Sequence, residues 1–508
     1  MCVQIDGHSL TIKNVVNVAR FNETVVLSEE AKKAIIKSRE TIDKLLASNK
    51  AVYGVNTGFG KLSNIKIENS ELKNLQENLI ISHAVGAGNN FEPEIVRAML
   101  LLRINSLANG YSGIRLETVE TMVEMLNKNV TPLVPEKGSL GASGDLAPLA
   151  HMVLPLIGRG KCLYQNEIMT GIDAFKKAGI KTIELQAKEG LALINGTQAM
   201  NAVGVLCVND AIELAKTLDI ASSLTIESLN GIIDAFDERV HALRPHLGQV
   251  ECARNIRKLT QNSKMITHQG QLRVQDGYSL RCIPQIHGAS VDAINYVKEK
   301  VEIEINSVTD NPLIFNETLE GISGGNFHGQ PLAIPFDTLG IALSEMASVS
   351  ESRIERLVNP ALSGLSSFLI KKGGVNSGFM IVQYAAAALV SENKVLSHPA
   401  SVDSISSSAG QEDHVSMGTI AARKAREIYK NARRVIAMEI LCASQAVDLA
   451  GNKGLGDGTN IAYQLVREKI PYLSKDRELY PDINFVEDLI IKGIINKEVI
   501  KKVGNLYE

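Results

Sequence analysis

Residues 138–145 read GSLGASGD and contain the residue types that most directly suggest covalent chemistry. Glycines let the backbone bend into conformations closed to residues that carry a Cβ. In such a bend the amide nitrogen of Gly144 can attack the carbonyl carbon of Ala142, and loss of water closes a five-membered ring. Loss of the Ser143 hydroxyl as a second water leaves an exocyclic methylidene, an electrophile that no natural side chain supplies. The alternative interpretation is an ordinary flexible loop, since Gly and Ser are common loop residues.

The longer segment GSLGASGDLAPLAHM resembles the signature of the aromatic amino-acid lyases, whose Ala-Ser-Gly triplet forms the methylidene-imidazolone (MIO) prosthetic group. Other segments similar to the family follow in order over roughly residues 50–420: YGVNTGFG, LINGTQAM, VQDGYSLRC, NSVTDNP, SGGNFHGQP and QEDHVSMG. The resemblance implies that Ala142, Ser143 and Gly144 form MIO autocatalytically. It also implies elimination of ammonia from an amino acid, with no metal, nucleotide or pyridoxal cofactor.

Further catalytic residues follow from the same resemblance. Tyr53, in YGVNTGFG, resembles the base of the family. A phenol has an ordinary pKa of about 10, so we expect nearby positive charge or helix N-termini to lower the pKa of Tyr53. Asn195 and Tyr278 resemble the residues that hydrogen-bond around the MIO ring. Without the motifs, Tyr53 could equally anchor its loop, and Asn195 could mark an ordinary turn.

Substrate binding is implied for five residues. Arg281 is similar to the arginine that binds the substrate carboxylate, for which a guanidinium offers two parallel donors. His83 and Glu412 resemble the residues that bind the imidazole in histidine-specific members, while Gln275 and Phe327 resemble further pocket residues. Alone, His83 would more often be structural and Glu412 an exposed loop carboxylate. Together they favour L-histidine as the substrate and trans-urocanate as the product, the first step of histidine degradation.

Two positions depart from the family pattern. Gly277 stands where proline or alanine is common, which could loosen the loop that aims Tyr278 and Arg281. Gly410 stands where asparagine is expected, which bears on the geometry of Glu412. The alternatives are a tyrosine or phenylalanine lyase, an aminomutase with the same electrophile, an inactive scaffold and a fumarase-like lyase. The sequence also leaves open whether the electrophile attacks the substrate amine or its imidazole ring.

These loops need a rigid scaffold, and the composition predicts a helical one. Aromatic residues make up 4% of the chain and Trp is absent, while Ala, Leu, Ile, Glu and Lys dominate. Long amphipathic helices are predicted at 197–228, 290–307, 335–358 and 418–449. Pro335 suits a first turn. The third helix has a predicted buried face made of Phe336, Leu339, Leu343, Met346, Ile354 and Leu357.

We therefore predict a mainly α fold, a long-helix bundle of the aromatic amino-acid lyase or fumarase-aspartase-like type with a smaller N-terminal lobe. Strands are predicted only in the first third, for example at 9–12 and 51–55, without the alternation that a parallel sheet requires. At 508 residues the chain should form two lobes. Residues 1–200 would carry the base loop and the MIO-forming segment, and residues 201–508 the bundle, the substrate-binding loops and the oligomer interface. The resemblance implies a homotetramer with each site built from loops of three subunits.

Charge and cysteine content limit the partners. With 53 basic and 56 acidic residues the net charge is -3, which gives no footprint for nucleic acid or an anionic membrane and favours a small-molecule substrate. Six cysteines lack metal-binding spacing, and the first residues lack a signal-peptide pattern, so we expect reduced thiols and a cytoplasmic protein. The longest nearly apolar stretch, 378–390, is shorter than the roughly 20 residues that a membrane-spanning helix needs.

Overall fold

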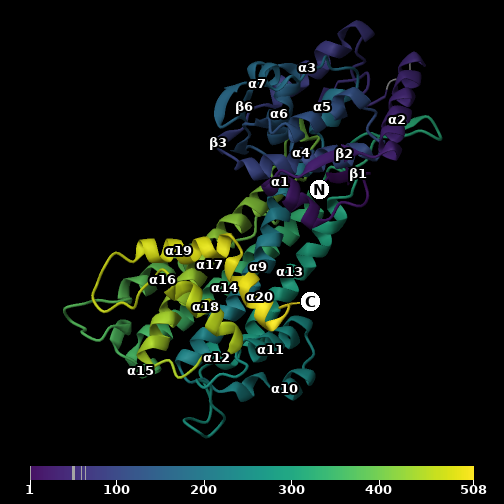
Figure 1. The fold of residues 1–508 in the computed structure, drawn as a ribbon. Helices are drawn as coiled ribbons and strands as arrows, with labels where there is room; N and C mark the ends of the chain where they lie inside the picture. The colour runs from purple at the N-terminus through teal and green to yellow at the C-terminus, as the bar shows by residue number, and fades with distance from the viewer. Residues whose placement is uncertain (1, 49–51, 59, 63, 508) are drawn as a thin grey trace. The chain divides into compact units, whose positions relative to one another are not determined.

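The computed structural model of the chain describes residues 2–48, 52–58, 60–62 and 64–507. Helices dominate and the strands form only small sheets, so the predicted mainly α fold is confirmed (Figure 1). The chain divides into two compact units, each made of three stretches. The first unit comprises 1–209, 298–337 and 399–423, and the second comprises 210–297, 338–398 and 424–508. Four of the unit boundaries fall inside the longest described helices: α9 (Gln198–Ser228), α13 (Ile283–Glu304), α14 (Gln330–Val358) and α17 (Gly418–Leu449).

The predicted long helices are present, with differences at their ends. Helices α9 and α17 agree with the prediction to within one residue, whereas α13 begins seven residues earlier than predicted and ends at Glu304. Helix α14 begins at Gln330, so the placement of Pro335 in the first turn is wrong. Pro331 stands in the first turn instead, and Pro335 lies inside the helix, where it has no N–H for the carbonyl of Pro331.

The predicted buried face of α14 is confirmed, since all six of its apolar residues are buried: Phe336, Leu339, Leu343, Met346, Ile354 and Leu357. By length and composition alone, α14 could cross a membrane, but 67% of its most apolar window is buried inside the protein. Helix α9 is buried on nearly every side, as expected for a helix at the centre of a bundle.

The first unit holds every described strand. Its elements, besides parts of the long helices, are β1 (Cys2–Ile5), α1 (Ile12–Phe21), β2 (Thr24–Leu27), α2 (Glu29–Ala47), α3 (Leu72–His83), β3 (Ala87–Asn90), α4 (Pro93–Ala108), α5 (Leu116–Asn127), β4 (Thr131–Pro132), β5 (Pro135–Lys137), α6 (Leu146–Val153), β6 (Lys161–Tyr164), β7 (Glu167–Thr170), α7 (Gly171–Ala178), α8 (Glu189–Ile194), β8 (Leu313–Phe315) and β9 (Glu320–Ile322). Strands β1 and β2 pair in parallel, β3 pairs with β5, and β4, β6 and β7 form a three-stranded antiparallel sheet.

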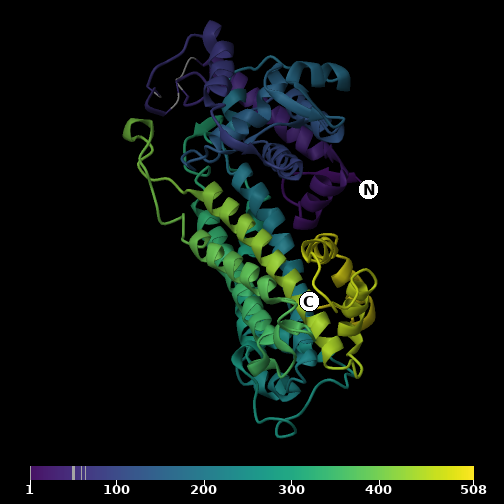
Figure 2. The same cartoon turned by 90° about the vertical axis from the view of Figure 1, so that its left-hand side faces the viewer.

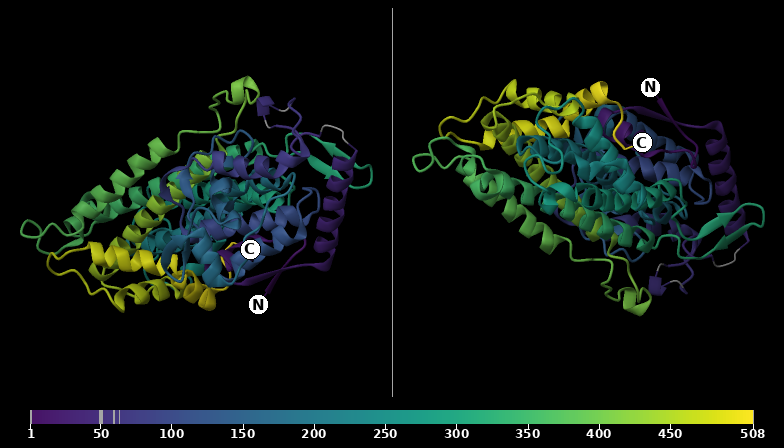
Figure 3. Two further views of the ribbon diagram at one scale, coloured as in Figure 1. Left: turned by 90° about the horizontal axis from the view of Figure 1, so that it is seen from above. Right: turned by 90° about the horizontal axis from the view of Figure 1, so that it is seen from below.

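The strand predictions are wrong. Residues 9–11 form no strand and Ile12 begins α1, because Thr11 caps that helix by accepting a hydrogen bond from the Asn14 N–H in a capping box. Residues 53–55 form a turn, and residue 51 lies outside the described residues. The antiparallel hairpin of β8 and β9 lies beyond the first third of the chain. It lies beside α2 (Figure 3). Ile314 of the hairpin packs with Ile42 and Leu45 of that helix.

Among its described residues the second unit contains helices joined by loops and no strand. Besides the other parts of the long helices, it contains α10 (Glu238–Ala242), α11 (Leu247–Leu259), α12 (Tyr278–Arg281), α15 (Pro360–Ser363), α16 (Met380–Leu396), α18 (Asp457–Arg467), α19 (Tyr480–Ile491) and α20 (Ile494–Val503). Within this unit the four long helices run side by side (Figure 2), and a buried polar network joins them.

That network explains how the bundle of the second unit accommodates charge. The Arg353 guanidinium on α14 donates to the Glu439 carboxylate on α17. It also donates to His287 Nε2 on α13 at 3.1 Å. His287 Nδ1 lies 2.8 Å from Asp219 Oδ1 on α9. Because Arg353 donates to Nε2, the hydrogen of the His287 ring is on Nδ1 and is donated to Asp219. Burial lowers the pKa of His287, consistent with this neutral form.

Candidate active site

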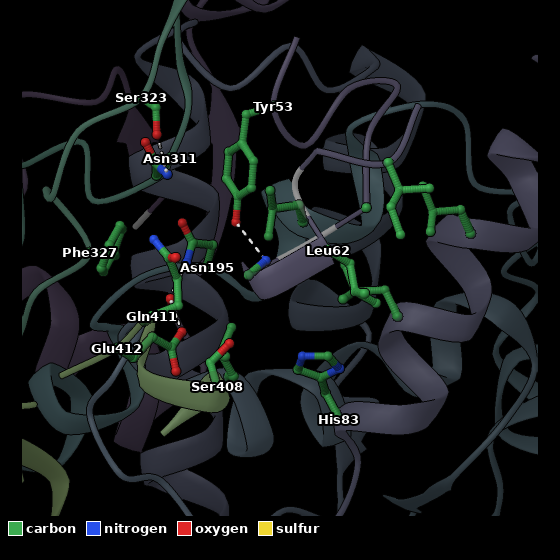
Figure 4. A pocket seen from close by; sticks show the side chains of 18 of the residues that line it. Tyr53, Leu62, His83, Asn195, Asn311, Ser323, Phe327, Ser408, Gln411 and Glu412 are labelled. Carbon is green, nitrogen blue, oxygen red and sulfur yellow. Dashed lines mark hydrogen bonds between the residues drawn. The ribbon is translucent and has the colours of Figure 1, made fainter. Parts of the chain in front are cut away.

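A cavity of about 990 Å³ in the first unit is lined by residues from several connecting segments. Six of the predicted site residues line it: Tyr53, His83, Ser143, Asn195, Phe327 and Glu412. Figure 4 shows that the Tyr53 hydroxyl, the His83 ring and the Glu412 carboxylate all face this space. Ser143, Asn195, Phe327 and Glu412 stand in the segments that lead into α6, α9, α14 and α17 respectively. Helix starts therefore position most of the site.

The Ala142-Ser143-Gly144 segment is a tight bend held against a second glycine. Gly144 has φ +72°, and a Cβ at this position would lie 2.1 Å from the Gly196 carbonyl oxygen. The same carbonyl accepts a hydrogen bond from the Asp145 N–H at 2.7 Å. Because φ is left-handed and the approach is close, only glycine fits at position 144.

Asp145 anchors the end of this bend, a role that the sequence interpretation missed. Its buried carboxylate accepts hydrogen bonds from the Ser139 hydroxyl at 2.7 Å, from the Met200 N–H at 2.7 Å and from the Thr419 hydroxyl. Burial raises the pKa of Asp145, and these hydrogen bonds oppose that rise. The carboxylate thereby ties the bend to the first residues of both α9 and α17.

Ser143 is held from two sides. Its hydroxyl donates to Glu412 Oε1 at 3.0 Å, and its carbonyl oxygen accepts from Asn195 Nδ2 at 3.0 Å. Asn195 Oδ1 is buried and has no hydrogen-bond partner among the described residues. The turn that carries Asn195 is fixed by the fully buried Arg103, whose Nη1 donates to the Asn195 carbonyl at 2.8 Å and to Gln198 Oε1 at 3.0 Å. The side chain of Asn195 is thus fixed on the Ser143 carbonyl.

Tyr53 lies in a turn, half-buried, with its hydroxyl oxygen accepting from the Gly60 N–H at 3.4 Å. Burial raises the pKa of Tyr53, the Gly60 hydrogen bond opposes the rise, and the carboxylates of Glu412 and Asp310 add to it. The expectation that its surroundings lower this pKa is therefore wrong for the single chain. None of the described residues that line the cavity is a lysine or an arginine, so no such charge on the cavity wall offsets burial.

His83 and Glu412 face the same cavity from different elements. His83 ends α3, its Nδ1 lies 3.1 Å from the Ser82 hydroxyl, and burial lowers the pKa of its ring, although Glu412 opposes that shift. Glu412 Oε2 accepts from the Ser407 hydroxyl at 2.8 Å, and the backbones of these two residues pair in both directions. The carboxylate is therefore held in a fixed orientation.

The turn before Glu412 explains Gly410. Ser408, Ala409 and Gly410 have φ values of +52°, +54° and +83°. No atom of the described residues lies within 4 Å of a Cβ added at position 410. A left-handed backbone, not lack of space, favours glycine there, and asparagine tolerates that conformation best among other residues. This turn also packs against residues 60–62, where a Cβ on Gly60 would meet the Ser408 hydroxyl at 2.6 Å.

Five predicted site residues do not line the cavity. Ala142 and Gly144 flank Ser143 in the bend, whereas Gln275, Tyr278 and Arg281 belong to the second unit. Gln275 and Tyr278 are exposed, and the Arg281 guanidinium lies 4.6 Å from the centre of the Tyr278 ring. Gly277 is the N-cap of α12, and a Cβ there would meet Arg356 Nη2 at 2.2 Å. A packed arginine therefore accounts for the small residue at position 277.

Sequence interpretation also missed polar residues around the cavity. Asn311 and Ser323 line it, with Asn311 Nδ2 donating to the Ser323 hydroxyl at 3.2 Å (Figure 4). Beside them, Lys188 and Asp310 form a fully buried ion pair at 2.8 Å. Asn311 and Asp310 lie in the NSVTDNP segment, so their motif was visible although their contacts were not.

Comparison with known proteins agrees with this geometry. A family model described as aromatic amino acid lyase matches residues 10–468. The histidine ammonia-lyase of Alkaliphilus oremlandii is 60% identical over 501 residues, which cover 99% of each chain. That of Caldanaerobacter subterraneus subsp. tengcongensis is 59% identical over 506 residues, covering 100% of this chain and 99% of the relative.

Solved structures of related proteins share the fold. The histidine ammonia-lyase of Trypanosoma cruzi has a TM-score of 0.92 and 42% identity, covering 99% of this chain and 95% of that one. The tyrosine aminomutase of Streptomyces globisporus has a TM-score of 0.96 and 37% identity, covering 100% of both chains. Fold similarity therefore extends over members with different reactions, and the residues of the cavity must decide between them.

Proposed function

Because this chain belongs to the aromatic amino acid lyase family, we propose that it eliminates ammonia from L-histidine to give trans-urocanate. The observation that carries the proposal is that His83 and Glu412 line the same cavity as Ser143 and Tyr53. An imidazole and a carboxylate are suitable hydrogen-bond partners for a substrate imidazole. The lowered pKa of His83 favours its neutral ring, which can both donate and accept.

The residues present fit the MIO group, and we infer that Ala142, Ser143 and Gly144 form it. Gly144 packs against Gly196 without room for a Cβ. Asn195 donates to the Ser143 carbonyl, while its buried Oδ1 has no partner in the described part of the chain. The group supplies an electrophilic methylidene conjugated with that carbonyl. Asn195 is therefore placed to stabilise negative charge on the Ser143 oxygen, as donors in an oxyanion hole do.

Tyr53 is proposed as the base that takes a β-proton, and Phe327 as an apolar wall of the substrate pocket. The cavity wall of the described chain has no lysine or arginine that could stabilise a Tyr53 phenolate. The substrate carboxylate needs such a cation as well. We infer that Arg281 supplies the charge from a neighbouring subunit, together with Gln275 and Tyr278. Gln275 and Tyr278 are exposed in the second unit, and the half-buried Arg281 stacks on the Tyr278 ring at 4.6 Å, which supports this assignment.

We also propose a homotetramer, as the family resemblance implies, and the sharing of sites between its subunits can be tested by complementation. Tyr53→Phe and Arg281→Ala chains are each expected to be inactive alone. When the two are unfolded together and reassembled, some sites would combine an intact Tyr53 with an intact Arg281 from another chain, so activity should return in part. No recovery in mixed assemblies would contradict shared sites.

We propose a small-molecule substrate and a cytoplasmic location from the charge and the cysteines of the chain. The net charge of -3 favours a small-molecule substrate over nucleic acid. No disulfide joins the six cysteines in the described chain, which is compatible with a reducing compartment such as the cytoplasm.

The central experiment mixes the purified protein separately with L-histidine, L-tyrosine and L-phenylalanine, and follows released ammonia and the near-ultraviolet absorbance of a conjugated acrylate. Both signals should rise with L-histidine and disappear in Ser143→Ala. Turnover of L-tyrosine or L-phenylalanine alone would refute the roles of His83 and Glu412. Formation of a β-amino acid without ammonia would favour an aminomutase, the activity named for the structural neighbour from Streptomyces globisporus.

A further inference from the structure

We propose that Glu412 has an earlier role than substrate binding: its carboxyl group promotes loss of the Ser143 hydroxyl while the chain matures. The inference rests on the proposed function, because it assumes that residues 142–144 form MIO. It assigns a separate catalytic task to a residue that the proposed reaction uses only for substrate recognition.

The contact that supports this role is direct. Ser143 Oγ lies 3.0 Å from Glu412 Oε1, and Glu412 is the hydrogen-bond partner of that hydroxyl in the described chain. The other carboxylate oxygen, Oε2, is fixed by the Ser407 hydroxyl at 2.8 Å. Backbone hydrogen bonds of 2.9 and 3.3 Å between Ser407 and Glu412 hold the carboxylate in this position. A fixed carboxyl group at hydrogen-bond distance satisfies the geometric requirement for proton transfer.

Hydroxide is a poor leaving group, so the hydroxyl must receive a proton as it departs. With Glu412 protonated, the 3.0 Å contact runs in the opposite direction and Glu412 donates to Ser143 Oγ. The Cβ–Oγ bond breaks, Oγ takes the Glu412 proton and leaves as water, and the electron pair of the Cα–H bond becomes the Cα=Cβ bond. The Cα proton passes to solvent water, and Glu412 remains as a carboxylate.

The departure of the hydroxyl also changes what Glu412 can do next. While Ser143 keeps its hydroxyl, Oε1 is engaged by it. Once the hydroxyl has left as water, Oε1 has lost this partner and faces the cavity, where an incoming imidazole can donate to it. Maturation thereby frees the acceptor that substrate recognition requires, so the two tasks of Glu412 follow one another.

The proposal separates the two losses of water. Ring closure joins the Gly144 nitrogen to the Ala142 carbonyl carbon, atoms of a backbone that Gly196 and Asp145 hold. Glu412 contacts the hydroxyl instead. A chain without the carboxyl group should therefore close the ring and then stall, one molecule of water lighter than the translated sequence.

The test is intact-protein mass spectrometry of freshly folded Glu412→Gln, followed over time together with the near-ultraviolet absorbance of the conjugated group. Wild type should be two waters lighter. Glu412→Gln should be mainly one water lighter and should lose the second about 100-fold more slowly, the range of general acid catalysis. Asp413→Asn removes the adjacent exposed carboxylate, and His83→Asn alters the other imidazole-binding residue. Both should lose two waters at the wild-type rate.

Two results would overturn the proposal: loss of both waters from Glu412→Gln at the wild-type rate, or retention of both in a chain with wild-type circular dichroism. If Glu412→Gln does not fold, Ser407→Ala tests the same step, because it frees Oε2 while leaving the carboxylate and the paired backbone in place. It should slow the second loss of water only, and an unchanged rate would count against the proposal. A wild-type chain that keeps both waters would instead refute the proposed electrophile, and this role with it.

Discussion

Replacing Gly144 by alanine should both destabilise the chain and prevent maturation. An alanine at φ +72° occupies the left-handed region, which costs a non-glycine residue about 1–2 kcal/mol. Its Cβ would also lie 2.1 Å from the Gly196 oxygen, where contacts below 3.0 Å force something to move. Displacing that carbonyl breaks its 2.7 Å hydrogen bond from Asp145, at a further cost of about 1–3 kcal/mol.

The chain offers a matched control for the first of these costs. Gly179, the C-cap of α7, has φ +63°, and no described atom lies within 4 Å of an added Cβ. Gly179→Ala should therefore cost about 1–2 kcal/mol, whereas Gly144→Ala should cost about 2–5 kcal/mol, the sum of the backbone and hydrogen-bond terms. Urea denaturation at one fixed protein concentration measures both, since the stability of an oligomer depends on concentration.

Mass measurement provides the second readout. Gly179→Ala should mature and lose two waters, because it lies outside the bend. Gly144→Ala should keep both, because the displaced backbone no longer presents its nitrogen to Ala142. Equal destabilisation by the two substitutions, or full maturation of Gly144→Ala, would show that the contact with Gly196 does not hold the bend for ring closure.

Other substitutions test the remaining roles. Tyr53→Phe should lower kcat by about 10²–10⁴-fold. In wild type, turnover should rise with pH through the pKa of Tyr53, which burial raises. A pH-independent wild-type rate would contradict a tyrosine base. Asn195→Ala should lower kcat by about 10²–10³-fold yet still lose both waters, so failure to mature would assign it a different role. Arg281→Lys should raise KM for L-histidine more than it lowers kcat, because an ammonium cannot offer two parallel donors. Steady-state kinetics would measure both effects, and an unchanged KM would argue against carboxylate binding by Arg281. Lys188→Met should destabilise the chain by about 3–5 kcal/mol, because it leaves the fully buried Asp310 carboxylate without its ion-pair partner. Urea denaturation should show that stability recovers in Lys188→Met/Asp310→Asn, and a mild effect of Lys188→Met alone would contradict this reasoning.

The sequence predicted those parts of the site that short motifs encode. The bend at 142–144 is readable because glycines and a serine stand together, and the long helices are readable because apolar residues recur at helical spacing. Pro335 shows the limit of this reading. A proline predicts a first turn in general, but Pro331 already occupies that position and the helix tolerates the second proline inside.

Contacts between distant residues could not be predicted, since no local periodicity encodes them. Lys188 and Asp310 are 122 positions apart. Arg103 stands in an apolar stretch of α4, and only the fold reveals that it holds the Asn195 turn. Asp145 was visible beside the Ala-Ser-Gly triplet, but its partner Thr419 lies 274 positions away. An unexpected charge in an apolar segment is the signal that could have drawn attention to Arg103.

The first unit supplies the acidic and neutral parts of the proposed chemistry without the cationic part. It holds Ser143 by hydrogen bonds to both Glu412 and Asn195. It also half-buries Tyr53, whose pKa is raised by burial and by two carboxylates. A phenolate and a substrate carboxylate in the same cavity both require positive charge, and the described wall provides neither lysine nor arginine. An arginine that reaches the cavity from a neighbouring chain would meet both needs at once. Assembly would then control the ionisation of the base as well as substrate binding, so a correctly folded and matured single chain should remain inactive until it finds its partners.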